Sequence, residues 1–358
     1  VHTAVIICLA GGILITVFGI LFSHNILALM KTKDELIDGA VLYLRIYLLG
    51  MPALGLYNFG NAVLSAAGDT KRPLYYLAFA GVVNVILNLF FVIVCHLGVA
   101  GVALASMISQ FISAFLILRA LLTGKEKYCL RLSEIRFDRR KAAGILQIGI
   151  PSAFQYSLFA FANLFVQSSV NSFDHVLVEG NSAAANDDPI VYDMMAAFYT
   201  ACSSFIAQNF GAQKKKRILQ TYLICLFYSF ITSLVLGVGL YLARYPFLYL
   251  FTSDKAVVEA GITRLSIMAL SYSASAFMDA SIAASRGLGK TAVPTFVVVM
   301  GSCVFRIIWI YTIFAYFHTI QSLYILYVFS WGITAIAENI YFFHVYRHTL
   351  TGKTESHL

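Results

Sequence analysis

The chain has 358 residues, of which 60% are hydrophobic and 12% are charged, and its formal net charge is +8 at pH 7. Soluble domains carry about 25% charged residues, so this composition excludes an ordinary soluble domain with a polar surface. The positive charge does not call for a nucleic-acid partner, because a basic membrane face accounts for it.

Ten apolar segments follow one another along the chain, and each is long enough to cross the hydrocarbon core, which takes about 20 mostly apolar residues per helix. Their periodicity is helical, and backbone groups in lipid must bond internally, so we expect an all-α membrane protein. The predicted spans are 3–30, 40–67, 74–96, 99–122, 143–172, 190–211, 218–243, 257–286, 293–317 and 322–346.

The basic residues lie mainly on one side of these spans. Of the 25 Lys and Arg residues, seventeen fall in the loops after even-numbered spans or in the tail, and four fall in the loops after odd-numbered spans. Because cytoplasmic loops are enriched in Lys and Arg, we expect the even-numbered loops and the C-terminus in the cytoplasm. The predicted location is the cell membrane, inner or plasma membrane, with multiple passes.

The sequence also contains an internal repeat at an offset of 221 residues. It aligns the loop Gly68–Pro73 (GDTKRP) with the loop Gly289–Pro294 (GKTAVP), and both loops follow even-numbered spans. The two halves therefore run in the same direction, as in parallel repeats related by an axis along the membrane normal. The second half has six spans and the first only four, so we expect two further spans before Val1. The predicted parts are an N-terminal lobe over 1–122, a cytoplasmic linker over 123–142, a C-terminal lobe over 143–347 and a cytoplasmic tail over 348–358.

The motifs of both halves together resemble the multidrug and toxic compound extrusion (MATE) transporters. The motif residues that we single out are Gly68, Asp69 and Pro73 of GDTKRP, Gln208, Asn209 and Gly211 of QNFGA, Arg286, Gly287 and Gly289 of RGLG, and Arg306 of RIIW.

This resemblance implies two pseudo-symmetric lobes of six helices around a central cavity, with ten of the twelve spans present in this chain. It also implies export of small organic compounds, often cations, in exchange for Na⁺ or H⁺. We accordingly expect a transporter rather than an enzyme, with no cofactor besides the coupling ion. Its partners would be its substrates and the membrane lipids, and we expect a monomer.

Asp279 is the acidic residue placed most deeply within a span. A charged side chain at the bilayer centre costs about 2.5–3.5 kcal/mol on insertion scales, so it is first interpreted as functional. The repeat aligns Asp279 with Asn58, so the lobes differ by one negative charge at equivalent positions. We predict that Asp279 couples ion movement to transport, with transient Na⁺ as the one metal ion to consider. A hydrogen bond between helices is the alternative.

Four other polar residues within spans are candidates for the cation or substrate site. Glu338 lies deep in the last span, where an ion pair with Arg306 or Arg264 is as good an explanation as transport. Asp193 lies near the start of its span, and an interfacial position would also explain it. Gln155 and Asn163 are eight residues apart and share a helix face, where they would line the cavity or bond a neighbouring helix.

Two other classes of function remain as alternatives. A flippase for lipid-linked saccharides shares the two-lobe layout, and a cavity rich in Arg and Lys would favour its anionic cargo. A membrane-embedded enzyme would need a catalytic motif, and the sequence contains no HExxH or GxSxG. The stretch 284–291 (ASRGLGKT) resembles a phosphate-binding loop, but an apolar helix precedes it where that loop needs a strand.

Overall fold

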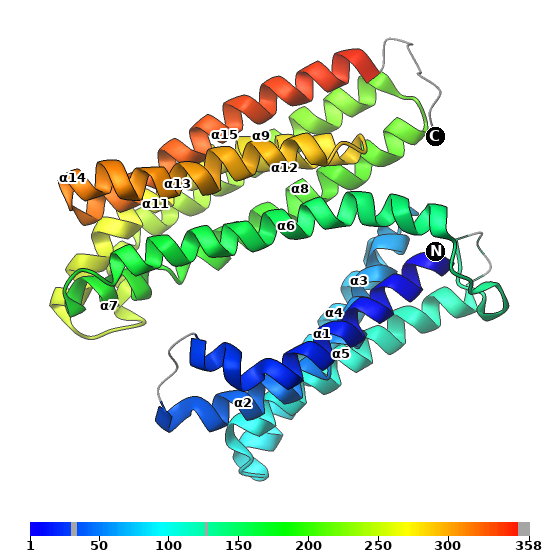
Figure 1. Ribbon diagram of the computed structural model, residues 1–358, viewed down its shortest axis with the longest axis horizontal. Helices are drawn as coiled ribbons and strands as arrows, with labels where there is room; N and C mark the ends of the chain where they lie inside the picture. Colours follow the sequence, from blue (N-terminus) through cyan, green and yellow to red (C-terminus); the bar gives the residue numbers. More distant parts are fainter. Residues whose placement is uncertain (30–33, 125, 127, 350–358) are drawn as a thin grey trace. The chain divides into compact units, whose positions relative to one another are not determined.

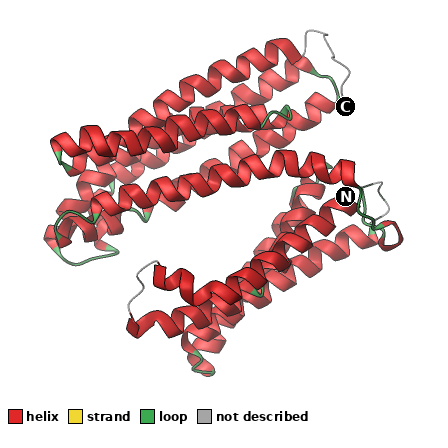
Figure 2. Cartoon of the chain, viewed as in Figure 1, coloured by secondary structure: helices red, strands yellow, loops and turns green. Residues whose placement is uncertain are grey.

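The computed structural model describes residues 1–29, 34–124, 126 and 128–349, and every regular element in these ranges is helical (Figures 1 and 2). Contacts between residues divide the chain into two compact units, Val1–Leu146 and Gln147–Leu358. Two of the predicted linker's basic residues, Lys125 and Lys127, and the predicted tail from residue 350 onward lie outside the described residues.

The first unit contains five α-helices and the beginning of a sixth. The elements are α1 (His2–Leu29), α2 (Asp34–Leu48), α3 (Met51–Ala66), α4 (Lys71–Leu89) continued by the π-helix η1 (Phe90–Val94), α5 (Gly98–Thr123), the 3₁₀ turn η2 (Leu132–Glu134) and the start of α6 (Arg139–Val170).

The second unit contains the rest of α6 and the remaining helices. They are α7 (His175–Ala184), α8 (Asp187–Gly211), α9 (Lys215–Leu242), α10 (Arg244–Tyr249), α11 (Lys255–Gly287), α12 (Ala292–Val298), the π-helix η3 (Val299–Val304), α13 (Phe305–Trp309), the π-helix η4 (Ile310–Phe314), α14 (Ala315–Phe317) and α15 (Ile320–Thr349).

The predicted all-α membrane architecture is confirmed. Within the described residues, nine helices are long and apolar enough to cross a membrane, or ten if the bent pair α2 and α3 forms one span. The bend is 43° and lies at Leu49–Gly50, directly before Pro52 in the first turn of α3. Proline lacks the N–H that would continue the ladder of hydrogen bonds from α2, which explains the break.

The repeat predicted at 221 residues recurs in the helix boundaries. Helix α3 ends at Ala66 and α11 at Gly287, while α4 begins at Lys71 and α12 at Ala292, and both pairs are separated by the same offset. The glycines of the two loops, Gly68 and Gly289, adopt φ values of +91° and +76°. Glycine enters this left-handed region without strain, which is why both loops need it.

The segment before α6 differs from the predicted linker at its end. Helix α6 begins at Arg139, so the last four residues of the predicted linker over 123–142 are helical. Asp138 accepts hydrogen bonds from the backbone N–H groups of Arg140 (2.9 Å) and Lys141 (3.2 Å) and so caps this helix. The hydrogen bond from Lys141 is the main reason why the pKa of Asp138 is lowered from its usual value.

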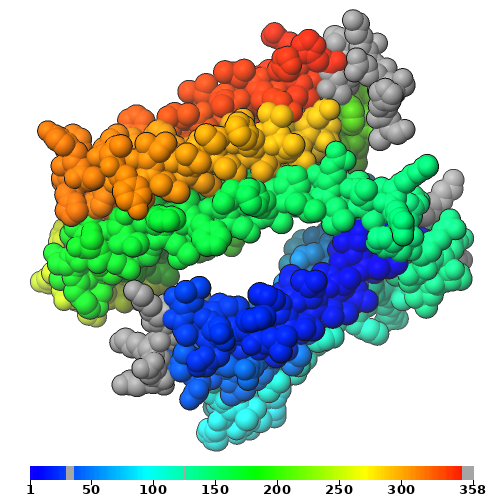
Figure 3. Space-filling model, in the orientation of Figure 1, coloured from blue at the N-terminus to red at the C-terminus, as the bar shows by residue number. Residues whose placement is uncertain are grey.

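Helix α11 is the central element of the second unit, where it packs against α7, α8, α9 and α15. Its sequence from Ser271 to Gly287 is rich in Ala, Ser and Gly, small residues that let neighbouring helices approach closely. Apolar side chains instead cover the outside of the segment α12–η4, including Phe296, Met300 and Tyr311. The space-filling view shows this segment in gold to orange as a continuous part of the surface (Figure 3).

Gly287 marks the closest approach of α11 to α8. A Cβ atom built on Gly287 would lie 2.8 Å from the carbonyl oxygen of Ser203 and 2.8 Å from Cγ2 of Ile206. We expect Gly287→Ala to destabilise the folded protein by about 1–3 kcal/mol, because the backbone of α8 must move away. Thermal unfolding of the purified protein measures this loss. Gly239→Ala on α9 is the control, since nothing lies within 4 Å of its Cβ position, and equal stability of the two variants would contradict the expectation.

Candidate functional site

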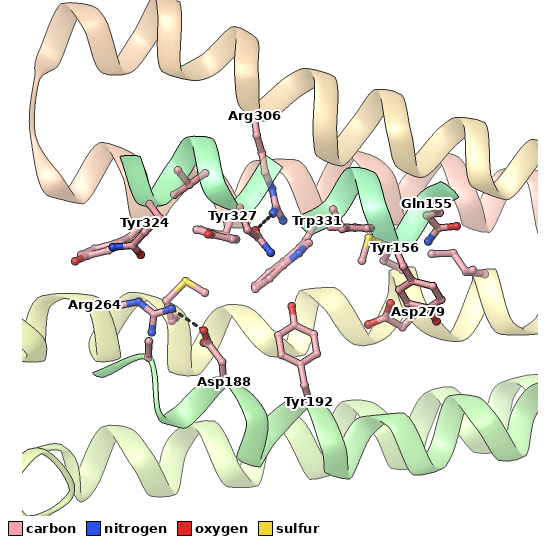
Figure 4. A pocket seen from close by; sticks show the side chains of 18 of the residues that line it. Gln155, Tyr156, Asp188, Tyr192, Arg264, Asp279, Arg306, Tyr324, Tyr327 and Trp331 are labelled. Carbon is pink, nitrogen blue, oxygen red and sulfur yellow. Dashed lines mark hydrogen bonds and ion pairs between the residues drawn. The ribbon is translucent and has the colours of Figure 1, made fainter. Parts of the chain in front are cut away.

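The second unit encloses a cavity of about 420 Å³ whose lining comes from α6, α8, α11, α13 and α15, with Asn181 and Ala185 at the end of α7 (Figure 4). The lining combines aromatic rings with a small number of charged and amide side chains. Ligand sites in proteins have this character, mostly apolar with a few placed polar groups. Five charged residues line the cavity: Asp188, Arg264, Asp279, Arg286 and Arg306.

Asp279 lines the cavity from the C-terminal third of α11, eight residues before the helix ends at Gly287 (Figure 4). Within the described part of the chain, its carboxylate has no hydrogen-bond partner and no ion-pair partner within 4.0 Å. The guanidinium of Arg286 acts on it electrostatically from farther away. Carboxylate oxygens without protein partners are free to bind a proton or a hard cation such as Na⁺.

Gln155 lines the same region of the cavity from α6 and is 4% exposed. Its Oε1 atom accepts hydrogen bonds from an Nη atom of Arg286 (2.8 Å) and from Oγ1 of Thr295 (3.3 Å). The guanidinium of Arg286 also lies 5.9 Å from the ring of Tyr156. Arg286, identified from the sequence as a motif residue, is therefore part of the cavity wall beside Asp279.

Asn163 lines the cavity two turns farther along α6, so the prediction that it shares a face with Gln155 is confirmed. Its Oδ1 atom accepts a hydrogen bond of 2.8 Å from Arg306, which also donates to Oγ of Ser330 at 3.3 Å. The guanidinium lies 4.4 Å from the ring centroid of Tyr327. Arg306 is thus held by neutral partners and an aromatic face, and it keeps its positive charge in the cavity.

Four side chains form an ionic cluster where α8 begins. Arg264 of α11 donates to Oδ1 of Asp187 (3.3 Å) and to Oδ2 of Asp188 (2.8 Å). The hydroxyl of Tyr272 donates a hydrogen bond to the other oxygen of Asp188. Neither aspartate was among the predicted site residues, because the predicted span begins at residue 190 and leaves both in the preceding loop.

Aromatic rings lie between the ionic cluster and Asp279 (Figure 4). Tyr192 of α8 makes an edge-on contact with Tyr272 at 5.5 Å, and Trp331 of α15 lies 5.9 Å from Tyr272 and 5.5 Å from Tyr327. Flat apolar rings of this kind stack on planar organic compounds, and their faces attract organic cations.

Glu338 does not have the partners predicted for it. Its side chain on α15 is completely buried, and within the described residues neither carboxylate oxygen has a hydrogen-bond partner. The predicted ion pair with Arg306 or Arg264 is wrong, since Arg306 bonds Asn163 and Arg264 pairs with the two aspartates. Asn339, next to Glu338, contacts the carbonyl of Phe277, and Arg264 lies thirteen residues earlier on α11, about 20 Å along the helix.

The remaining candidates lie away from this cavity. Asp193 is exposed on α8 and does not line the cavity, and Asn58 is exposed on α3 in the first unit. Gln208, Asn209 and Gly211 form the last turn of α8, where Asn209 donates a hydrogen bond of 2.8 Å to the carbonyl of Phe205.

The first-unit loop residues have a local role. In that loop Asp69 pairs with Arg72 at 2.5 Å, and the carbonyl of Pro73 accepts a hydrogen bond from Tyr57 at 3.0 Å. The first interaction joins the loop to the first turn of α4, and the second joins that turn to the middle of α3.

Comparison with known proteins places the chain among membrane transporters. The MatE family model matches residues 1–90 and 151–312. A Bacillus subtilis protein described as probable multidrug resistance protein YpnP is 34% identical over 201 residues, which cover 56% of this chain and 44% of that protein. A Shewanella oneidensis FAD transporter is 24% identical over 251 residues, 68% of this chain and 55% of that protein. The chain thus spans about half the length of these curated relatives.

A solved structure, the outward-facing conformation of a multidrug resistance MATE family transporter, superposes with a TM-score of 0.88 at 21% identity. The superposition covers 97% of this chain and 78% of that one. At this identity the likeness establishes the fold.

Proposed function

Because the chain belongs to the MatE family, we propose that it is a secondary active antiporter that exports organic compounds, often cations, in exchange for Na⁺ or H⁺. The observation that carries the proposal is the aromatic cavity of the second unit, which contains the carboxylate of Asp279, and no residue in the described ranges bonds this carboxylate. The multidrug resistance description of the Bacillus relative agrees with such an activity. We further expect the protein to work as a monomer among membrane lipids.

Exchange follows from competition for one negative charge. An organic cation stacked on Tyr192 and Trp331 would be stabilised by the nearby carboxylate of Asp279. Binding of a proton or Na⁺ to that carboxylate removes the attraction and favours release of the substrate. Each ligand then biases the inward-open or outward-open state by its differential affinity, which links the two fluxes.

Uptake of a fluorescent cationic dye into vesicles that contain the product of the whole gene tests this proposal. We expect an outwardly directed Na⁺ or proton gradient to drive accumulation of the dye in proteoliposomes, and dissipation of the gradient to stop it. The choice between the two ions follows from which gradient suffices alone. Dye uptake that responds to neither gradient would contradict the proposal.

A second candidate is transport of an anionic compound, such as a lipid-linked saccharide. It is favoured by Arg286 and Arg306, which line the cavity and hydrogen-bond neutral side chains rather than carboxylates. The FAD transporter among the relatives acts on a phosphate-containing compound. Uptake of a negatively charged fluorescent dye by the same vesicles distinguishes the two candidates, because a cation exporter would not transport it.

We also propose that the loops after even-numbered spans and the C-terminus face the cytoplasm, and this makes a topological prediction. Lys216 is exposed at the start of α9, in the loop after the sixth predicted span. Cys95 is exposed directly after η1, in the loop after the third predicted span, which the proposal places outside the cell. In whole cells an impermeant thiol reagent should label Cys95 but not Lys216→Cys in a Cys95→Ser background. Permeabilised cells should show labelling at both positions, and ready labelling of Lys216→Cys in intact cells would reverse the orientation.

A further inference from the structure

The ionic cluster of Asp187, Asp188, Arg264 and Tyr272 is separate from Asp279. Asp188 and Arg264 line the cavity, and the two carboxylates belong to the first turn of α8. The side chains of Asp187 and Arg264 are 0% and 7% exposed, and that of Asp188 is 32% exposed. Asp279 lies seven residues after Tyr272 on α11, about 10 Å along the helix.

The charges of this cluster do not balance. Two carboxylates face one guanidinium, and Tyr272 contributes a neutral hydroxyl. The first turn of α8 adds a partial positive charge of roughly half a unit, but α7 ends at Ala184 and brings the opposite partial charge close by. An uncompensated charge in a buried site is costly, so native proteins neutralise it.

The hydrogen bonds also indicate that the cluster lacks one positive charge or proton. Oδ2 of Asp187 is buried and has no hydrogen-bond partner within the described residues. The two carboxyl groups meet at one guanidinium, where Oδ1 of Asp187 lies 3.3 Å from Nη1 of Arg264 and Oδ2 of Asp188 lies 2.8 Å from Nη2. Two ionised carboxylates are both acceptors and cannot bond each other, whereas a protonated carboxyl group donates to an ionised one.

From this charge count and geometry we propose that Asp187 and Asp188 share one exchangeable proton, so that the cluster is a second proton site at the other end of the cavity from Asp279. With the proton bound, one carboxylate pairs with Arg264 and the cluster is neutral. Without it, the cluster carries a negative charge beside the cavity, through Asp188. The role of this proton in exchange rests on the proposed antiport, whereas its presence does not.

Among the described residues, Asp279 is the one further acid that lines this cavity besides Asp188. Helix α11 contributes Arg264 and Tyr272, α8 contributes Tyr192, and α15 contributes Tyr324 and Tyr327 from the cavity wall. The nearest acidic residue of α7, Glu179, pairs with His175 on the surface. The section of α9 that packs here presents Leu236 and Leu240.

Infrared spectroscopy of the purified full-length protein at neutral pH tests the site without any substrate. We expect a carbonyl band of a protonated carboxyl group that is lost in Asp187→Asn and equally in Asp188→Asn. Either substitution leaves one carboxylate paired with Arg264, which needs no proton. Glu179→Gln is the matched control and should keep the band, and Asp279→Asn identifies any separate contribution of Asp279.

A second measurement asks whether the proton takes part in exchange. A cationic dye is added to the protein in weakly buffered solution, and a pH indicator counts the protons released per dye bound. We expect Asp187→Asn and Asp188→Asn each to lower this number by the same amount relative to the parent and to Glu179→Gln.

Different results would contradict the second proton site and the proposed antiport. An infrared band that is unchanged in both variants would overturn the second proton site. A proton count that they leave unaltered while dye still binds would overturn its part in exchange. A band that vanishes in both variants supports the site, even if the parent protein transports no dye and the proposed antiport is thereby rejected.

Discussion

Asp279→Asn should reduce gradient-driven dye transport to the level of vesicles without the protein, while the purified variant keeps some, weaker, dye binding. Asparagine has nearly the same shape and fits the cavity, but it cannot be protonated or balance a cation. The substitution also removes a charge that costs about 2.5–3.5 kcal/mol to place at a bilayer centre. Membrane insertion and yield should therefore match those of the parent.

Asp254→Asn is the control for this experiment. Asp254 caps the same helix by accepting a hydrogen bond of 2.8 Å from the backbone N–H of Ala256, and asparagine caps helices about as well. This variant should transport at the parental rate. Should Asp279→Asn also transport at the parental rate under the same gradient, Asp279 would be a structural residue and the coupling site would lie elsewhere.

Arg264→Ala should destabilise the folded protein by about 3 kcal/mol at neutral pH, because it leaves the negatively charged pair Asp187 and Asp188 in the protein interior without its cation. This loss lies at the lower end of the range for broken buried ion pairs, because the Asp188 side chain is 32% exposed and water screens its charge. The loss should shrink as the pH falls, because protonation neutralises the two carboxyl groups that the substitution leaves without a cation.

Unfolding of the detergent-purified protein at several pH values measures this effect. Arg244→Ala is the matched control, because Arg244 lies at the surface end of α9 and α10 and donates to the carbonyl of Tyr241. It should change stability little at any pH. Equal stability of the Arg264 and Arg244 variants at neutral pH would show that the ion pairs of Arg264 do not stabilise the folded protein.

The membrane fold could be predicted from the sequence, because a segment in lipid must satisfy its backbone hydrogen bonds internally. Each span must be a long apolar helix, so the ten predicted segments coincide with helices of the structure to within a few residues at most boundaries. The main exception is the predicted span 40–67, which is two helices, α2 and α3, and begins at Asp34. Helix α7, from His175 onward, was also not predicted. The repeat could be recognised because both loops contain a backbone position with positive φ, which favours glycine at residues 68 and 289.

The site was predictable only in part. Asp279, Gln155 and Asn163 were identified as polar residues within apolar segments, and all three line the cavity. Asp187 and Asp188 were missed because they precede the apolar run of α8, where acidic residues are ordinary first-turn residues. The available signal was Arg264, a lone guanidinium within a span that needed an acidic partner.

The partners of each polar residue depend on helix rotation and on which helices are neighbours, and hydropathy does not specify either. Arg306 and Arg264 were therefore plausible partners for Glu338 from the sequence, equal to a transport role, but both arginines bond other residues of the same unit. It also treated Arg286 as a loop motif, although its side chain reaches Gln155 across the cavity.

The two π-helices η3 and η4 flank α13, the five-residue helix that carries Arg306. A π-helical turn corresponds to one residue inserted into an α-helix, which shifts the angular position of everything after it by about 100°. Deleting a single residue from 299–304 would thus turn Arg306 away from Asn163 without changing any amino acid that lines the cavity. In this stretch the number of residues sets the direction in which the one charged side chain of α13 points, so the charge that the cavity presents depends on chain length as well as on residue type.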